Sequence, residues 1–401
     1  MILLINTVFF KQFTPSYVAV MFWSIQIIIC LICIDEEGFS CFDGLGWIWF
    51  VLFFCMIFGL SAERKNIQKS KYLRLINVTV AKKCVILQCW LSYFCVILNI
   101  LNHGFDFESV FSLNALAQAN NEMAVNRYSG LDTGGGIAQL FLPFVYSSCL
   151  SAGYFGGICR SNSLKVMIFS IIPSVLIIFS LNTKAVFLYS VIFLSVGFFV
   201  GCHNSGYSIR LNCRYKLILL VSCIVFISIM IFSMMLRIGS LDTYTLNIVL
   251  NKLWSYSLGH IPAFCSWIDS NIGSDLYLGE KTFLGPLSFL GVSERLPGVY
   301  SEFWTNGIIG TNVYTYFRGF VEDFGVIGGA IVFILFIKFG DYAYSSVTYS
   351  KYINMWTSIL SFVYCFVLWW VVSIATYTSL VISFFIFYLF LRTASMKNVE
   401  R

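Results

Sequence analysis

The chain has 401 residues, of which 59% are hydrophobic and 11% charged, and its mean hydropathy is +0.83. A soluble globular domain carries about 25% charged residues, so this composition excludes a soluble protein with a hydrated charged surface. The net charge of +6 does not indicate nucleic-acid binding, because the basic residues lie between apolar segments rather than in one patch.

Ten apolar segments approach the roughly 20 residues that a helix needs to cross a bilayer. The segment 1–10 is too short to cross by itself. Two long apolar stretches are each expected to form a helical hairpin, one divided at Asn182-Thr183-Lys184 and one near Ser373. The sequence therefore predicts an all-α polytopic protein forming a single integral membrane domain over 1–401, with spans at about 16–34, 46–62, 84–101, 137–157, 166–181, 185–201, 217–236, 324–340, 354–373 and 376–392.

The distribution of charge between these spans predicts the orientation. With both termini in the cytoplasm, the inner segments hold 18 of the 25 basic residues and three of the 19 acidic ones. Cytoplasmic loops of membrane proteins carry the excess of Lys and Arg, so we expect this orientation. Two long loops, 102–136 and 237–323, then lie on the opposite side.

The larger outer loop mixes aromatic and polar residues at roughly helical spacing in two stretches, 246–268 and 311–325. This spacing predicts amphipathic helices at the membrane surface. If these helices have a function there, we expect them to form the sides of a groove that binds a lipid headgroup. Sequence motifs for ATP hydrolysis, zinc proteolysis and serine hydrolysis do not occur. The 14 Cys lie mostly in apolar segments and do not group with the three His in a metal-like pattern, so we expect neither a metal site nor a cofactor.

The outer segments contain seven basic residues among many acids. An outer Arg either pairs with an acid or binds an anion, and a guanidinium binds phosphate oxygens through two hydrogen bonds. Arg318 is the best candidate for a phosphate ligand, followed by Arg295 and Arg127. The full set is Arg127, Lys184, Arg237, Lys252, Lys281, Arg295 and Arg318.

Acidic residues follow Arg318 closely. On a helix, Arg318 and Glu322 are four residues apart and face each other, which predicts at least a structural ion pair. The alternative hypothesis is a catalytic role, in which one carboxylate acts as a base and accepts a proton from a sugar hydroxyl. The candidates for this base are Glu322, Asp323 and His260, the one His in the larger loop.

The stretch Gly310–Gly329 resembles the late outer loop of bacterial O-antigen polymerases, also called oligosaccharide repeat-unit polymerases. The resemblance rests on the run from Asn312 to Phe317 and on Asp323-Phe324-Gly325 entering the next span. Further similar positions are Tyr256 to His260, Ala263-Phe264 before Trp267, Arg127-Tyr128-Ser129, and Lys184, where the family often has Arg or Lys.

The resemblance implies a membrane glycosyltransferase of the GT-C type at the periplasmic face of the inner membrane. Such an enzyme joins undecaprenyl-diphosphate-linked oligosaccharide repeat units without a metal and within the lipid membrane. A polysaccharide chain-length regulator is a further candidate partner. The implied catalytic residues are Arg318, Glu322, Asp323 and His260. The implied ligands of the diphosphate and glycan are Arg127, Arg295, Arg237, Lys184, Tyr128, Asn312 and Tyr314.

Three other functions stay open. An O-antigen ligase, which transfers the finished glycan to lipid A–core, shares the architecture and the arginine-rich loop. A metal-dependent transferase using a polyprenyl-monophosphate sugar would use Asp35-Glu36-Glu37 in the first outer loop. A polysaccharide flippase or transporter is expected to show polar residues inside spans, pseudo-symmetry and short loops on both sides, which this chain does not show.

Overall fold

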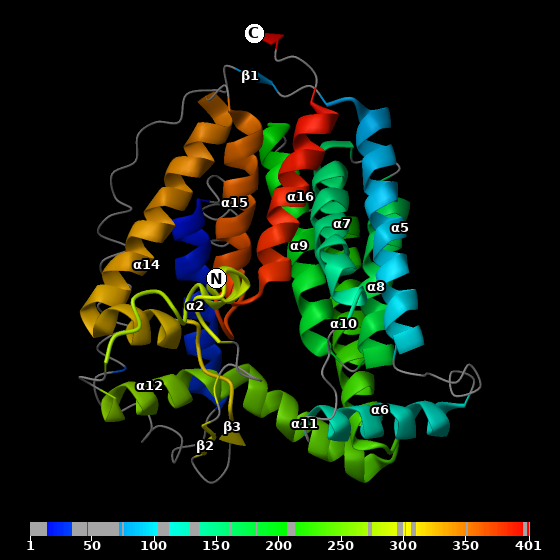
Figure 1. Ribbon diagram of the computed structural model, residues 1–401, viewed down its shortest axis with the longest axis vertical. Helices are drawn as coiled ribbons and strands as arrows, with labels where there is room; N and C mark the ends of the chain where they lie inside the picture. The colour runs from blue at the N-terminus through cyan, green and yellow to red at the C-terminus, as the bar shows by residue number, and fades with distance from the viewer. Residues whose placement is uncertain are drawn as a thin grey trace. The chain divides into compact units, whose positions relative to one another are not determined.

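The computed structural model describes 14–33, 46, 72–73, 76–102, 112–128, 136–159, 163–181, 183–206, 213–271, 275–294, 300, 302–305, 310–349, 352–395 and 399–400. Within these residues the protein is all-α, with 13 α-helices, one 3₁₀ helix and four two-residue strands (Figure 1). The elements are α2 (Pro15–Cys33), β1 (Tyr72–Leu73), α5 (Val78–Asn102), α6 (Leu113–Tyr128), α7 (Ala138–Cys159), α8 (Leu164–Leu181), α9 (Lys184–Asn204), α10 (Cys213–Ile238), α11 (Thr243–Leu258), α12 (His260–Ser270), α13 (Leu284–Phe289), β2 (Trp304–Thr305), β3 (Gly310–Thr311), α14 (Phe317–Tyr349), α15 (Ile353–Leu368), η3 (Ile374–Thr376), α16 (Thr378–Ala394) and β4 (Val399–Glu400).

Four of the described helices are long and apolar enough to cross a bilayer, namely Val78–Asn102, Lys184–Asn204, Val221–Ile238 and Phe317–Val347. Shorter apolar helices occupy Pro15–Cys30, Leu164–Ser180, Ile353–Leu368 and Thr378–Ala394. The chain is a multi-pass membrane protein. The predicted span at 46–62 lies outside the described residues apart from Gly46, and the other nine each coincide with a helix.

A helix ends and another begins at both places where an apolar stretch was predicted to divide into a helical hairpin. Helix α8 ends at Leu181 and α9 begins at Lys184. Helix α15 ends at Leu368, and α16 begins at Thr378 after the short helix η3. The Ser373 hydroxyl accepts a hydrogen bond from the Ala375 backbone N–H at 3.1 Å, which caps η3 and fixes this break.

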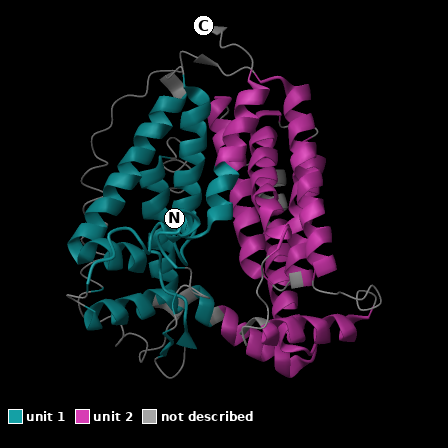
Figure 2. Ribbon diagram, in the orientation of Figure 1, with its two compact units in different colours: residues 1–72, 254–384, 400–401 teal, residues 73–253, 385–399 magenta. Residues whose placement is uncertain are grey.

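The chain divides into two compact units, coloured separately in Figure 2. The first comprises 1–72, 254–384 and 400–401, and the second comprises 73–253 and 385–399.

In the second unit, α7 and α9 pack with their backbones in close contact. A Cβ on Gly153 would lie 2.0 Å from the Leu194 carbonyl oxygen, and one on Gly201 would lie 2.4 Å from that of Tyr154. Gly157 and Gly197 meet the facing backbone in the same way, so each helix contributes a GxxxG pair. Small residues at this spacing let membrane helices approach closely. Because α7 is buried along most of its length, its serines and glycines meet protein rather than lipid.

In the first unit, α14 packs with α2 and α15 and is broken at Gly325, whose φ of 75° and ψ of 173° are not helical. The break separates a short arm, 317–324, from the rest of α14. The predicted helix at 311–325 is therefore correct only from Phe317, because 310–316 is non-helical and begins as strand β3, paired antiparallel with β2. The other predicted amphipathic stretch, 246–268, is helical as α11 and α12, separated at Gly259.

Candidate functional site

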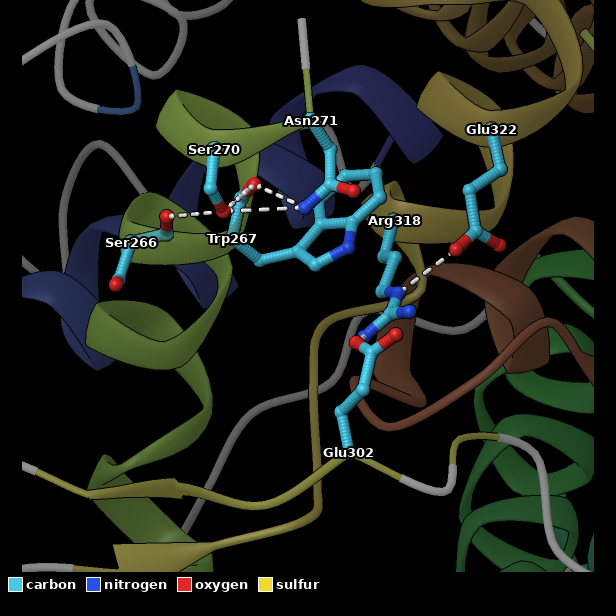
Figure 3. A network of polar contacts seen from close by, with 7 residues as sticks. All are labelled: Ser266, Trp267, Ser270, Asn271, Glu302, Arg318 and Glu322. Atoms are coloured by element: carbon cyan, nitrogen blue, oxygen red, sulfur yellow. Dashed lines mark hydrogen bonds and ion pairs between the residues drawn. The ribbon is translucent and has the colours of Figure 1, made fainter. Parts of the chain in front are cut away.

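Arg318 lies in the first turn of the α14 arm, and its side chain is buried at 5% exposure. Its Nη1 is 2.7 Å from Glu302 Oε2, and its Nε donates a hydrogen bond to Glu322 Oε1 at 2.8 Å (Figure 3). The predicted pairing of Arg318 with Glu322 is confirmed. Glu302 is a second partner that was not predicted, because it lies 16 residues away in the chain.

Three aromatic rings surround the same guanidinium. The Arg318 Cζ atom is 4.0 Å from the ring centroid of Tyr300, 4.4 Å from that of Tyr314 and 4.6 Å from that of Trp267. A cation over an aromatic face is stabilised by the ring quadrupole, and the stabilisation grows when water is excluded. Burial raises the pKa of both tyrosine hydroxyls, that of Tyr300 well above its ordinary value, so both rings are neutral.

The end of α12 positions the Trp267 ring. The Trp267 carbonyl accepts hydrogen bonds from Asn271 Nδ2 at 2.9 Å and from Ser270 Oγ at 3.0 Å. These bonds occupy a carbonyl that has no partner within the last turn of a helix. Figure 3 shows this polar cap beside Arg318, so the backbone that carries the Trp267 ring is fixed at the end of α12.

The two carboxylates bound to Arg318 differ in their surroundings. The Glu302 side chain is 57% exposed, whereas that of Glu322 is 11% exposed. Glu322 Oε2 is buried and has no hydrogen-bond partner among the described residues. Ion pairs with an exposed partner contribute little to stability, whereas removing one partner of a buried pair is costly. The ion pair of Arg318 with Glu302 is therefore the one that breaks at the smaller cost.

Asp323 anchors a loop. Its Oδ1 accepts from the Lys281 backbone N–H at 2.9 Å and its Oδ2 from that of Thr282 at 2.7 Å. The side chain is fully buried. Both oxygens hold backbone donors, so this geometry favours a structural role for Asp323 over the role of base.

His260 is fully buried at the start of α12, beside Trp23 and Trp370, whose ring centroids are 6.1 Å and 6.4 Å away. Neither ring nitrogen has a hydrogen-bond partner among the described residues. Burial lowers the pKa of His260 to about 3, which keeps the imidazole neutral. These surroundings favour a packing role over proton transfer.

The other predicted residues of the first unit differ in whether they lie near Arg318. Tyr314 is buried against Arg318, whereas Asn312 is exposed on the segment between β3 and α14. Tyr316 is also buried, and its hydroxyl accepts a hydrogen bond from Trp23 Nε1 at 2.9 Å. Arg295 and the Asp35-Glu36-Glu37 run lie outside the described residues.

The other predicted ligands belong to the second unit. Arg127 and Tyr128 end α6, and their side chains are not among those described. Lys184, at the first position of α9, interacts electrostatically with Arg237 and Lys252. These three basic residues come from α9, α10 and α11, so the fold brings together side chains that the sequence leaves dispersed.

Two partners of Arg318, Tyr300 and Glu302, lie in the irregular segment before β2. The sequence shows a tyrosine and a glutamate in a loop rich in acidic and aromatic residues. No rule of sequence spacing links these two residues to Arg318. No family model, curated protein or solved structure matches this chain.

Proposed function

We propose that this protein is a glycosyltransferase that polymerises undecaprenyl-diphosphate-linked oligosaccharide repeat units, as an O-antigen polymerase, at the periplasmic face of a bacterial inner membrane. The observation that carries the proposal is the buried Arg318 guanidinium, held among three aromatic rings with one exposed and one buried carboxylate. The resemblance of the run from Asn312 to Gly325 to that family supplies the reaction.

The leaving group of this reaction is a lipid diphosphate, which gains negative charge as the glycosidic bond breaks. A fixed cation at that point stabilises the transition state without reorganisation of solvent. In the proposal, a diphosphate oxygen replaces Glu302 at Arg318 Nη1, because the exposed Glu302 moves into water at small cost. Glu322 stays on Nε and holds the guanidinium in place.

Glu322 also supplies the base. The acceptor hydroxyl oxygen bonds to the anomeric carbon as the bond from that carbon to the diphosphate oxygen breaks. The hydroxyl proton passes to Glu322 Oε2, and the bond's electron pair leaves with the diphosphate. Oε2 is free of other partners among the described residues, whereas both oxygens of Asp323 are occupied. A single displacement of this kind inverts the anomeric configuration.

The first test is the lipopolysaccharide ladder of cells that lack the gene and carry wild type, Arg318→Ala or Arg318→Lys at matched expression. We expect wild type to restore long chains and both variants to leave core with one repeat unit. Lys lacks the planar fork that binds a diphosphate and Glu322 together. Arg392→Ala, at an exposed arginine of α16, is the matched control and should restore the ladder.

Other outcomes separate the competing functions. A deletion that gives core alone, with long polymer on the carrier lipid, would indicate a ligase. An unchanged ladder in the deletion strain would overturn both readings. A restored ladder with Arg318→Ala would leave polymerisation standing and remove Arg318 from it.

A further inference from the structure

Large apolar side chains are exposed along the segment that follows α12, residues 276–292, which we call the apolar loop. Leu278, Phe289, Leu290 and Val292 are 79%, 76%, 72% and 70% exposed. Leu276, Tyr277 and Phe283 are also exposed. Contiguous apolar surface of this kind marks an interaction site rather than a water-facing loop.

The apolar loop is held firmly, so this exposure does not come from a loose segment. Asp323 binds the backbone N–H groups of Lys281 and Thr282. The Gly285 carbonyl accepts a hydrogen bond from Thr378 Oγ1 at 2.8 Å, and Gly285 packs so closely on Ala375 and Thr378 that a Cβ would not fit. One side of the loop therefore packs on the protein, and the apolar side chains point away from it.

The apolar surface continues onto α14. Ile327, Ile331, Leu335 and Phe339 form an exposed stripe at four-residue spacing on this candidate membrane span, the face that meets acyl chains.

The apolar loop joins this stripe at the helix break. The backbone N–H groups of Tyr277 and Leu278 donate to the carbonyls of Glu322 and Asp323, both at 3.1 Å. A Cβ on Gly325 would lie 3.7 Å from Leu276 Cδ2. Gly325 is two residues before Ile327, where the stripe begins.

Many backbone groups of the apolar loop are hydrogen-bonded, which favours its entry into hydrocarbon, where unpaired polar groups are costly. The N–H groups of Phe283, Leu287 and Leu290 donate to carbonyls within the loop at 2.9–3.2 Å. At the end of α13, Gly291 has a φ of 74° and Val292 N–H donates to the Leu287 carbonyl at 2.9 Å. This C-terminal motif pairs carbonyls that a helix end otherwise leaves to water.

We infer that the apolar loop is inserted among the acyl chains of the bilayer, as an anchor that does not cross it. The occupant of this surface is lipid, because the surface is continuous with the lipid-facing stripe of α14 and has its own hydrogen bonds. The half-buried Glu280 and Lys281 mark its polar edge, where Lys281 Nζ lies 4.2 Å from the Tyr277 ring centroid. This inference does not depend on the proposed glycosyl transfer.

The test places a polarity-sensitive fluorophore on Leu290→Cys in the full-length protein, reconstituted into vesicles of phosphatidylcholine and phosphatidylglycerol. We expect blue-shifted emission, at least twofold quenching by lipids brominated on the acyl chains, and little quenching by aqueous iodide. Ile327→Cys, on the α14 stripe, should behave in the same way. Glu294→Cys, at an exposed charge four residues beyond Leu290, should emit as in water and respond to iodide.

Wild-type protein labelled in parallel gives the background from native thiols, including the exposed Cys223. Emission from Leu290→Cys as in water, with quenching by iodide, would overturn the inference. Blue-shifted emission without quenching by brominated lipid would also overturn it, because a protein partner would then cover the loop. Elution of each variant at the wild-type volume in detergent shows that the fold is kept.

Discussion

Arg318 is stabilised by neighbours that also depend on it. Replacing it with Ala leaves Glu322 buried without its cation, which costs about 3 kcal/mol in comparable buried pairs. We expect Arg318→Ala to lower the free energy of unfolding by that order, and Glu322→Gln by less. The double variant should lose clearly less than the sum, because the two residues share one interaction. Denaturant unfolding in detergent measures this cycle, and strictly additive losses would contradict the coupling.

A substitution of Glu302, the other carboxylate at the Arg318 guanidinium, is expected to improve substrate binding. If an incoming diphosphate replaces this carboxylate, Glu302→Gln removes an internal competitor. We expect a lower KM for the lipid-linked repeat unit, by up to about fivefold for a pair worth up to about 1 kcal/mol, with kcat largely kept. Glu322→Gln should instead reduce kcat by at least a hundredfold, as expected for loss of a general base.

The measurement for both glutamates is polymerisation of purified lipid-linked repeat units by the detergent-solubilised protein. Glu294→Gln, at an exposed acid of the same loop, is the matched control. A loss of kcat in Glu302→Gln with Glu322→Gln unaffected would exchange the roles of the two residues.

His260 makes stability depend on pH. Its folded pKa of about 3 lies below the ordinary value of 6.5, so the unfolded chain binds a proton that the folded chain does not. The stabilisation by neutral His260 is complete above pH 6.5 and is lost as pH falls towards 3, by about 1.4 kcal/mol per unit. His260→Phe should flatten this part of the profile.

Thermal unfolding in detergent at pH 7.5 and pH 5.0 tests the role of His260. His203→Gln, at a partly exposed His at the end of α9, is the control and should keep the wild-type difference. Equal differences in wild type and His260→Phe would contradict the prediction.

At the scale of elements, the close contact of α7 and α9 depends on glycine. Ala at Gly201 would place a methyl group 2.4 Å from the Tyr154 carbonyl oxygen, and backbone on the facing helix moves less easily than a side chain. We expect Gly201→Ala to cost about 1–3 kcal/mol, although Ala is the better helix former. Gly328→Ala, where the nearest atom is a side-chain carbon at 3.4 Å, should be neutral or stabilising. Melting temperatures in one detergent compare the two, and equal shifts would show that backbone contact is not limiting.

Helix positions were predictable because long apolar runs and their polar breaks are local features of the sequence. The breaks near Asn182 and Ser373 are visible as polar residues inside apolar stretches. The GxxxG pairs of α7 and α9 are also local features of apolar segments, and they are a signal in the sequence for the close contact of these helices. The break at Gly325 and the non-helical course of 310–316 depend on distant partners, such as the Trp370 carbonyl that accepts from Tyr316 N–H at 3.1 Å. Amphipathic spacing carries no information on these contacts.

The candidate site was predictable in part for the same reason. Arg318 and Glu322 are four residues apart on one helix, so their pairing follows from sequence. The roles of Asp323 and His260 depend on what surrounds them, namely backbone donors at Lys281 and Thr282 for one and buried aromatic rings for the other. Spacing alone does not distinguish a carboxylate that anchors a loop from one that accepts a proton.

At the scale of the whole molecule, the orientation in the membrane is the prediction that the charge distribution supports most directly. The excess of Lys and Arg in short loops predicts that 237–323 is outside and that the C-terminal part of the sequence, with Arg392 and Lys397, is inside. We expect Glu294→Cys to react with a membrane-impermeant maleimide on intact spheroplasts of a bacterial host. Arg392→Cys should react only after lysis.

Wild-type protein treated in parallel gives the background from native thiols. Reaction of Arg392→Cys on intact cells, with Glu294→Cys protected until lysis, would invert the topology. The diphosphate chemistry proposed for Arg318 would then face the cytoplasm. The inverted result would remove periplasmic polymerisation, while the contacts of Arg318 with Glu302 and Glu322 would be unaffected. The labelling thus separates the side on which the protein acts from the chemistry that its buried arginine supports.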